Sequence, residues 1–92
     1  MTVRKRFGAN LRRQRYEAEL SQEALALRAS LHRTEVSLIE RGLRMPKADT
    51  IVKLASSLGI EPGLLFDGIA WQPGDVQPGR FKPVPRVPSE HG

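Results

Sequence analysis

The stretch SQEALALRASLHRTEVSLIERG, residues 21–42, predicts two short helices joined by a tight turn. Ser21 is a suitable N-cap for the first helix, because its hydroxyl can accept a hydrogen bond from a free N–H of the first turn. Leu25 and Ala29 are four residues apart and therefore share one apolar face. Only about three residues separate this helix from the next, which fits the steep crossing of a helix-turn-helix.

The helix after the turn is predicted from about residue 33 to 41, and the helix before it from about residue 22 to 29. In the later helix Val36 and Ile39 are three residues apart and face inward together. Gly42 then ends it, because glycine readily takes the left-handed conformation that closes many helices. The residues left on the outer face are Arg33, Thr34, Ser37 and Leu38.

The pattern resembles the helix-turn-helix of the Cro/C1-type, or XRE, family of DNA-binding transcriptional regulators. The residues that carry the resemblance, in the spacing of that family, are Ser21, Gln22, Glu23, Leu25, Ala26, Val36, Ser37, Ile39, Glu40, Arg41 and Gly42, with Leu11, Arg15, Pro46, Leu54, Ala55, Leu58 and Gly59 on either side. The match spans about residues 7–66. It departs from the family at Ser30, where a turn glycine is usual, and at His32, where a serine or threonine cap is usual.

The resemblance implies an all-α fold of five helices, like that of the lambda repressor DNA-binding domain. Helical patterns also cover about residues 7–19 and 47–58, and Pro62 suits the first position of a short fifth helix. We expect residues 1–68 to form this helix-turn-helix DNA-binding domain. Residues 69–92 hold five of the seven prolines, so we expect a Pro- and Gly-rich extended tail, which is either partly ordered or lies at a dimer contact.

The length and composition limit the classes of function that the chain can have. Its 92 residues suffice for one small domain. A net charge of +5 fits either a polyanionic partner or ordinary solubilising charge, and the helix-turn-helix pattern favours nucleic acid. There is no cysteine, and the two histidines are too few and too separated for a metal site. No enzyme motif occurs, so we expect no catalytic residue, no metal and no cofactor. No apolar run could span a bilayer, and we expect a cytoplasmic protein, associated with the nucleoid when it is bound to DNA.

The outer face of the second helix is where a helix-turn-helix reads base edges in the major groove. The predicted base-contacting residues are Arg33, Thr34, Ser37 and Leu38. Arg33 is the strongest candidate, because an arginine can bond guanine O6 and N7 together. The alternative for Arg33 is a phosphate contact. Leu38 either touches DNA or completes the local core.

Three further side chains are predicted to contact DNA phosphates: Gln22, Arg41 and Arg44. A helix N-terminus favours anions, and Gln22 resembles the phosphate-binding glutamine of the family. The alternative for Gln22 is an ordinary surface glutamine. Glu35 would repel phosphate, so it is expected to point away from DNA or to accept a bond from a cytosine amino group.

Arg15 and Glu40 are predicted to form a structural ion pair. The prediction follows from the resemblance, because both residues stand where the family pairs an inward arginine with the glutamate of its Glu-Arg-Gly sequence. The pair would tie the first helix to the end of the recognition helix. The alternative is that Arg15 is one more arginine of the surface.

The resemblance implies a homodimer on a palindromic double-stranded DNA operator, acting as a repressor or an activator. One recognition helix reads only a few base pairs, too few to stand out in a genome. The predicted dimer contact consists of Leu64, Leu65, Phe66, Ile69 and Trp71. The alternative is that Leu64 and Phe66 cap the core of a single chain, with Trp71 folded back over them. A rival function is that of an antitoxin-like or adaptor protein, whose tail binds another protein and whose DNA binding is secondary.

Overall fold

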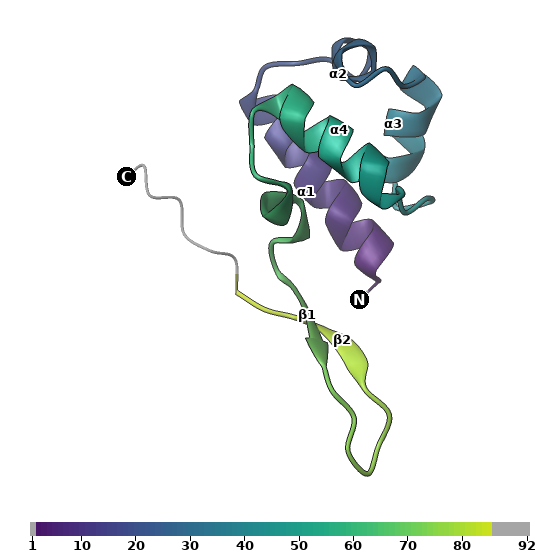
Figure 1. Ribbon diagram of the computed structural model, residues 1–92, viewed down its shortest axis with the longest axis vertical. Helices are drawn as coiled ribbons and strands as arrows, with labels where there is room; N and C mark the ends of the chain where they lie inside the picture. The colour runs from purple at the N-terminus through teal and green to yellow at the C-terminus, as the bar shows by residue number, and fades with distance from the viewer. Residues whose placement is uncertain (1, 86–92) are drawn as a thin grey trace.

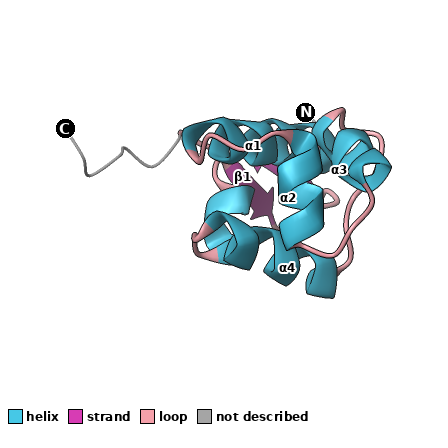
Figure 2. Ribbon diagram, turned by 90° about the horizontal axis from the view of Figure 1, so that it is seen from above, coloured by secondary structure: helices cyan, strands magenta, loops and turns pink. Residues whose placement is uncertain are grey.

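The computed structural model describes residues 2–85, which form a cluster of helices and a β-hairpin that extends from it (Figure 1). The elements are, in order, α1 (Val3–Glu17), α2 (Gln22–Arg28), α3 (Arg33–Glu40), α4 (Ala48–Leu58), the 3₁₀ helix η1 (Pro62–Phe66), β1 (Ile69–Gln72) and β2 (Arg80–Pro83). Seen from above, the helices gather in one group and the strands lie beneath them (Figure 2). None of the helices in this described part of the chain is long and apolar enough to cross a membrane.

The helices enclose one apolar core. Its buried members are Phe7, Leu11, Leu25, Ala26, Ala29, Val36, Ile39, Leu54, Ala55 and Leu65. Gly8 lets α1 approach the end of α3, because a Cβ at this position would clash with the backbone oxygen of Ile39. The position of α3 is therefore set by direct backbone contact with α1.

Each α-helix is followed within two residues by a residue with positive φ: 58° at Glu19, 55° at Ser30, 73° at Gly42 and 69° at Gly59. After α2, the N–H of Leu31 bonds back to the carbonyl of Ala26 over 2.8 Å, which is the closing bond of a Schellman motif. Ser30 thus adopts the conformation of the family's turn glycine, although a side chain costs about 1–2 kcal/mol there. The departure at Ser30 leaves the helix-turn-helix intact.

The predicted fifth α-helix is wrong, because this segment is a 3₁₀ helix. The N–H of Leu64 bonds to the carbonyl of Glu61 over 3.0 Å, and the N–H of Asp67 bonds to the carbonyl of Leu64 over 3.3 Å. Bonds between residues three apart define the 3₁₀ form, which suits short runs. Only five residues are available after Pro62, and Gly68, with φ of 82°, then turns the chain into β1.

The prediction of an all-α chain is also wrong, because part of the predicted tail, which was expected to be extended and either partly ordered or at a dimer contact, forms a β-hairpin. β1 pairs antiparallel with β2, and Trp71 lies opposite Phe81 with the ring centroids 4.9 Å apart. The prolines are compatible with this pairing: Pro73 and Pro78 lie in the connection, and Pro83 ends an edge strand. The last seven residues of the predicted tail lie outside the described part of the chain.

Candidate nucleic-acid interface

The start of α2 forms one edge of the candidate interface. Ser21 caps the helix, and its hydroxyl accepts a hydrogen bond from the N–H of Ala24 over 3.0 Å. Gln22 is the first helical residue, and its side chain is half-buried. Its Nε2 donates to Oε1 of Glu40 over 3.2 Å. The orientation of Gln22 is therefore fixed within the protein itself.

α3 buries one face and presents the other to solvent. Val36 and Ile39 have no exposed surface. The predicted base-contacting residues occupy the rest of the helix: Arg33 and Thr34 are exposed, and Ser37 and Leu38 are half-buried. Leu38 is not among the partly buried apolar residues that pack on the core, so part of its side chain is available at the surface. His32 stands at the N-cap of α3 without a side-chain capping bond.

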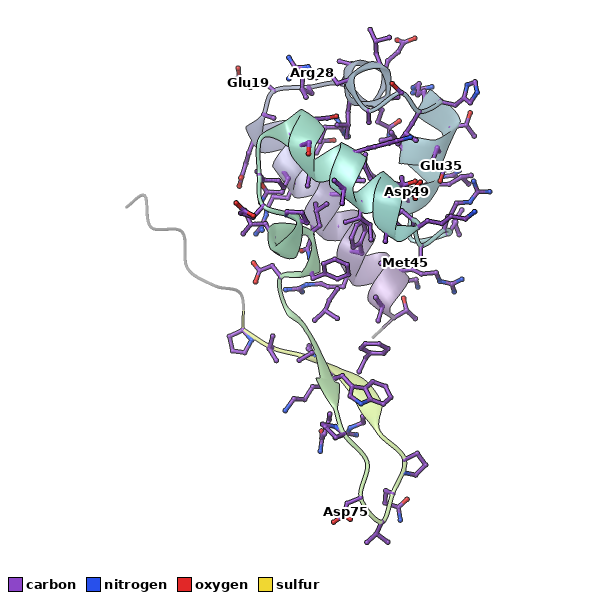
Figure 3. All side chains as sticks on the ribbon, viewed as in Figure 1. Glu19, Arg28, Glu35, Met45, Asp49 and Asp75 are labelled. Atoms are coloured by element: carbon purple, nitrogen blue, oxygen red, sulfur yellow. The ribbon has the colours of Figure 1, made fainter. Side chains whose placement is uncertain are left out.

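Two predicted phosphate contacts follow α3 directly. Arg41, at its C-cap, is exposed. Arg44 lies in the loop beyond, and its guanidinium forms an ion pair with the carboxylate of Glu35 on α3. Glu35, which projects from α3 (Figure 3), thus has a cation beside it that neutralises its charge on the helix predicted to contact bases. Arg44 can hold a phosphate only if it shares its charge with Glu35 or leaves it.

Arg15 and Glu40 join α1 to the end of α3. Nε and NH2 of Arg15 donate to the two carboxylate oxygens of Glu40 over 2.6 and 2.9 Å, and NH1 donates to the carbonyl of Leu20 over 2.9 Å. The side chains are only 7% and 3% exposed. The hydrogen bond with Glu40 raises the pKa of Arg15, against the opposing effect of burial. Since Gln22 also bonds to Glu40, one carboxylate connects α1, α2 and α3.

Tyr16 lies beside this pair on the exposed side of α1. Its hydroxyl accepts hydrogen bonds from Nε and NH2 of Arg12 over 3.2 and 3.1 Å. The guanidinium carbon of Arg15 lies 4.6 Å from the centroid of the tyrosine ring. Arg12 first, and Arg15 second, lower the pKa of Tyr16 because both cations favour the phenolate.

The predicted dimer residues do not share one environment. Leu65 is wrongly placed in that set, because it points from η1 into the core and has no exposed surface. Ile69 is half-buried and packs against the core. Leu64, Phe66 and Trp71 are 39%, 37% and 54% exposed. These three therefore expose apolar surface on η1 and β1, while Leu27, Leu43 and Val52 expose apolar surface elsewhere on the helical body.

The residues that fasten η1 to α1 were not predicted from the sequence. Nδ2 of Asn10 donates to the carbonyls of Leu65 and Asp67 over 3.0 and 2.8 Å. Arg13 lies 3.7 Å from the carboxylate of Asp67 in an ion pair. Asn10 is a polar residue next to the inward Leu11, and this position was the feature of the sequence that could have predicted the contact, because buried polar groups in native proteins are hydrogen-bonded.

Known proteins resemble this arrangement over the helical part of the chain. A family model described as Helix-turn-helix matches residues 11–65, more than half of the sequence. The chain belongs to this XRE-type family. It is therefore a DNA-binding transcriptional regulator, as the resemblance of its sequence predicted.

Several relatives of this XRE-type regulator match most of its length. The control protein C.BamHI of Bacillus amyloliquefaciens is 42% identical over 66 residues, which cover 71% of this chain and 82% of the relative. The restriction-modification controller protein C.AhdI from Aeromonas hydrophila is 45% identical, with a TM-score of 0.66, over 67% of this chain and 94% of that one. The hypothetical transcription factor NHTF from Neisseria is 34% identical, with a TM-score of 0.67, over 71% and 75% of the two chains.

Proposed function

We propose that this regulator is a controller-type protein that binds a two-fold symmetric duplex operator as a homodimer. The observation that carries the proposal is the division of α3 into a buried face and an open one. Val36 and Ile39 have no exposed surface, whereas Arg33 and Thr34 are exposed at the N-terminal end that enters the major groove in helix-turn-helix proteins. The controller role is proposed from the similarity to C.BamHI and C.AhdI.

Base reading is assigned to the open side of α3. Arg33 reads a guanine by bonding O6 and N7 together, a pairing that is worth about 1–3 kcal/mol of discrimination. Thr34 and Leu38 supply methyl groups for thymine, and Ser37 supplies a hydroxyl. Since one half-site is short, two copies of α3 about one helical turn apart are required for a site that is distinct within a genome.

Phosphate binding is assigned to Gln22, Arg41 and Arg44. Gln22 bonds to Glu40, the last residue of α3, and the two arginines follow that helix in the chain. Two of the three are cations, so binding weakens as salt rises, because phosphate contacts release counterions. The regulator acts in the cytoplasm, where it finds its operator, and works as a repressor or an activator according to the position of that operator.

Selection of bound sequences from a random pool of duplex DNA tests the proposal. We expect a palindrome whose half-sites are about 10 base pairs apart. A matched selection with Arg33→Ala should lose the base preference at one position in each half-site and keep the spacing between the half-sites. Failure of the wild-type protein to enrich any sequence above the starting pool would contradict the proposal. Co-purification of a second protein species, together with such a failure, would instead favour the adaptor function.

A further inference from the structure

The hairpin, residues 69–83, lies outside the helix-turn-helix match, which ends at residue 65. It leaves the helical body at the end opposite α2 (Figure 1), and Asp75 marks its far tip (Figure 3). All four residues of β2 are exposed, and Val76 in the connection is 90% exposed. A two-stranded hairpin alone is marginally stable in water and needs further strands or a packed face. In the described part of the chain the sheet has only these two strands, and the contact with the helical core is made by Ile69 at the start of β1.

One face of the hairpin is aromatic and only half covered. Trp71 and Phe81 are 54% and 49% exposed, and their rings meet edge to face at 71°. The segment from residue 62 to residue 74 contains a single charged residue, Asp67, whose side chain is only 6% exposed beside Arg13. An aromatic surface without charges is the composition of a protein–protein interface core. Arg80 and Lys82 alternate with Phe81 along β2 and so belong to the opposite face of the hairpin. The aromatic face therefore lacks the cations that DNA would require, and its partner is a protein.

The hydrogen bonding of the hairpin leaves one edge suitable for a further strand. The N–H of Val84 donates to the carbonyl of Gly68 over 3.0 Å, which makes these two a bonded pair. Bonded and non-bonded pairs alternate in antiparallel sheets, so the backbone groups of Ile69 and Trp71 point away from β2. On the opposite edge Pro83 occupies an outward position and has no N–H to donate. β1 is therefore the edge that can pair.

We propose that β1 pairs antiparallel with β1 of a second copy, so that a four-stranded sheet crosses the two-fold axis of the dimer. This proposal rests on the homodimer of the proposed function. The outward backbone groups of Ile69 and Trp71 can both form hydrogen bonds with the second copy only when Ile69 of one copy lies opposite Trp71 of the other. That register puts Ala70 on the axis, opposite Ala70 of the second copy.

The charges of the hairpin fit this pairing. β1 carries no charge, so no like charges meet at the axis. Arg80 and Lys82 both lie on β2, which becomes the outer strand on each side, about 14 Å from its symmetry mate. Pairing through β2 would instead bring the four cations together. The sheet forms at the end of the molecule away from α2, so it leaves the open face of α3 free for DNA.

Single cysteines introduced into the full-length chain test the register. The protein has no cysteine of its own, so each variant carries one thiol. Ala70→Cys places two thiols in a non-bonded antiparallel pair, with Cα atoms about 4.5 Å apart, within the range that a disulfide spans. Gln72→Cys is the matched control on the same face of the same strand, and its two Cα atoms are about 13 Å apart in this register.

With oxidised glutathione as the oxidant, Ala70→Cys should form a covalent dimer at least about tenfold faster than Gln72→Cys, because only its thiols lie within disulfide reach. The wild-type chain supplies a second measurement, since Trp71 is its only tryptophan. The fluorescence emission of Trp71 should shift to the blue over the same range of protein concentration in which sedimentation detects the dimer, because pairing would remove the ring from water. Equal cross-linking of the two variants, or dimerisation without a change in Trp71 emission, would overturn the proposed pairing.

The selection experiment separates this proposal from the proposed function. A wild-type protein that enriches a palindrome but fails the cysteine test retains its DNA-binding function and loses the strand pairing. A protein that sediments near 10.3 kDa at every concentration and still enriches a site without symmetry loses both the pairing and the dimer. Cross-linking at Ala70→Cys in a protein that enriches no DNA would support the pairing and contradict the operator.

Discussion

Replacement of Glu40 by alanine should destabilise the fold severely. The substitution leaves the guanidinium of Arg15, 7% exposed, without the carboxylate that accepts two of its hydrogen bonds. Removing one member of a buried pair costs about 3–5 kcal/mol, because the remaining charge stays buried. The carbonyl of Leu20 still accepts one bond from Arg15, which favours the lower part of that range. Small proteins have only about 5–15 kcal/mol of total stability, so the loss is a large fraction.

Thermal unfolding followed by circular dichroism at fixed protein concentration measures the effect. A domain of this size loses about 4–8 °C of Tm per kcal/mol, so we expect a fall of at least about 12 °C. Folding raises the pKa of Arg15. The stabilisation is therefore fully present at any pH below the ordinary pKa of arginine, and it is lost only as the pH rises through the higher pKa of the folded state. The loss should therefore be the same at neutral and mildly alkaline pH.

The double variant Arg15→Met/Glu40→Leu is the matched control, because it removes both charges and keeps similar volumes. Replacing a buried ion pair by apolar residues is often neutral or stabilising, so this variant should recover most of the lost Tm. An unchanged Tm in Glu40→Ala would refute the reasoning, since it would mean that the Arg15 guanidinium reaches water at little cost.

Three further predictions concern two residues proposed to contact DNA and the surface of α1. Arg33→Ala should cost about 1–3 kcal/mol on the preferred site but much less on random DNA, as measured by titration of both duplexes. Arg44→Ala should weaken binding to all duplexes and lower the slope of log K against log salt by about 0.9. The single tyrosine, Tyr16, should titrate below its ordinary pKa in an ultraviolet pH titration, and the midpoint should rise in Arg12→Gln because the main hydrogen-bond donor is removed.

Each of these has its own control. An equal loss on random DNA would make Arg33 a phosphate contact. Since Arg44 also neutralises Glu35, the double variant Glu35→Gln/Arg44→Ala should bind DNA more tightly than Arg44→Ala alone, and equal binding would show that the freed carboxylate is remote from DNA. A tyrosine midpoint unchanged by Arg12→Gln would contradict the role of Arg12.

The helix-turn-helix could be predicted from the sequence because its signals are local. α2 and α3 begin at the predicted residues and end one residue earlier than predicted. Ser21 is an N-cap, and Gly42 takes a left-handed conformation after α3. Each of these signals lies within a turn of the feature that it specifies, so no knowledge of distant contacts was needed.

The hairpin and the anchors of the site could not be predicted in the same way. Dense proline hides the alternation of β1 and β2, whose pairing joins residues as far apart as Ile69 and Pro83. The bond from Asn10 to the carbonyl of Leu65 spans 55 positions of the chain, and the pairing of Arg44 with Glu35 depends on the path of the loop after α3. Contacts of this kind arise only once the helices are packed.

The bond between Gln22 and Glu40 has a consequence for the entropy of DNA binding. Ordering a free side chain at an interface costs about 0.5–1.5 kcal/mol, but the rotamer of Gln22 is already selected in the free protein. Nε2 carries two hydrogens and Glu40 accepts one, so the other is available for the phosphate contact proposed for Gln22. The same carboxylate also holds Arg15, which lies on a different helix and is almost fully buried. A substitution of Arg15 in α1 can therefore loosen the proposed phosphate contact of Gln22, by returning rotational freedom to a glutamine on the next helix.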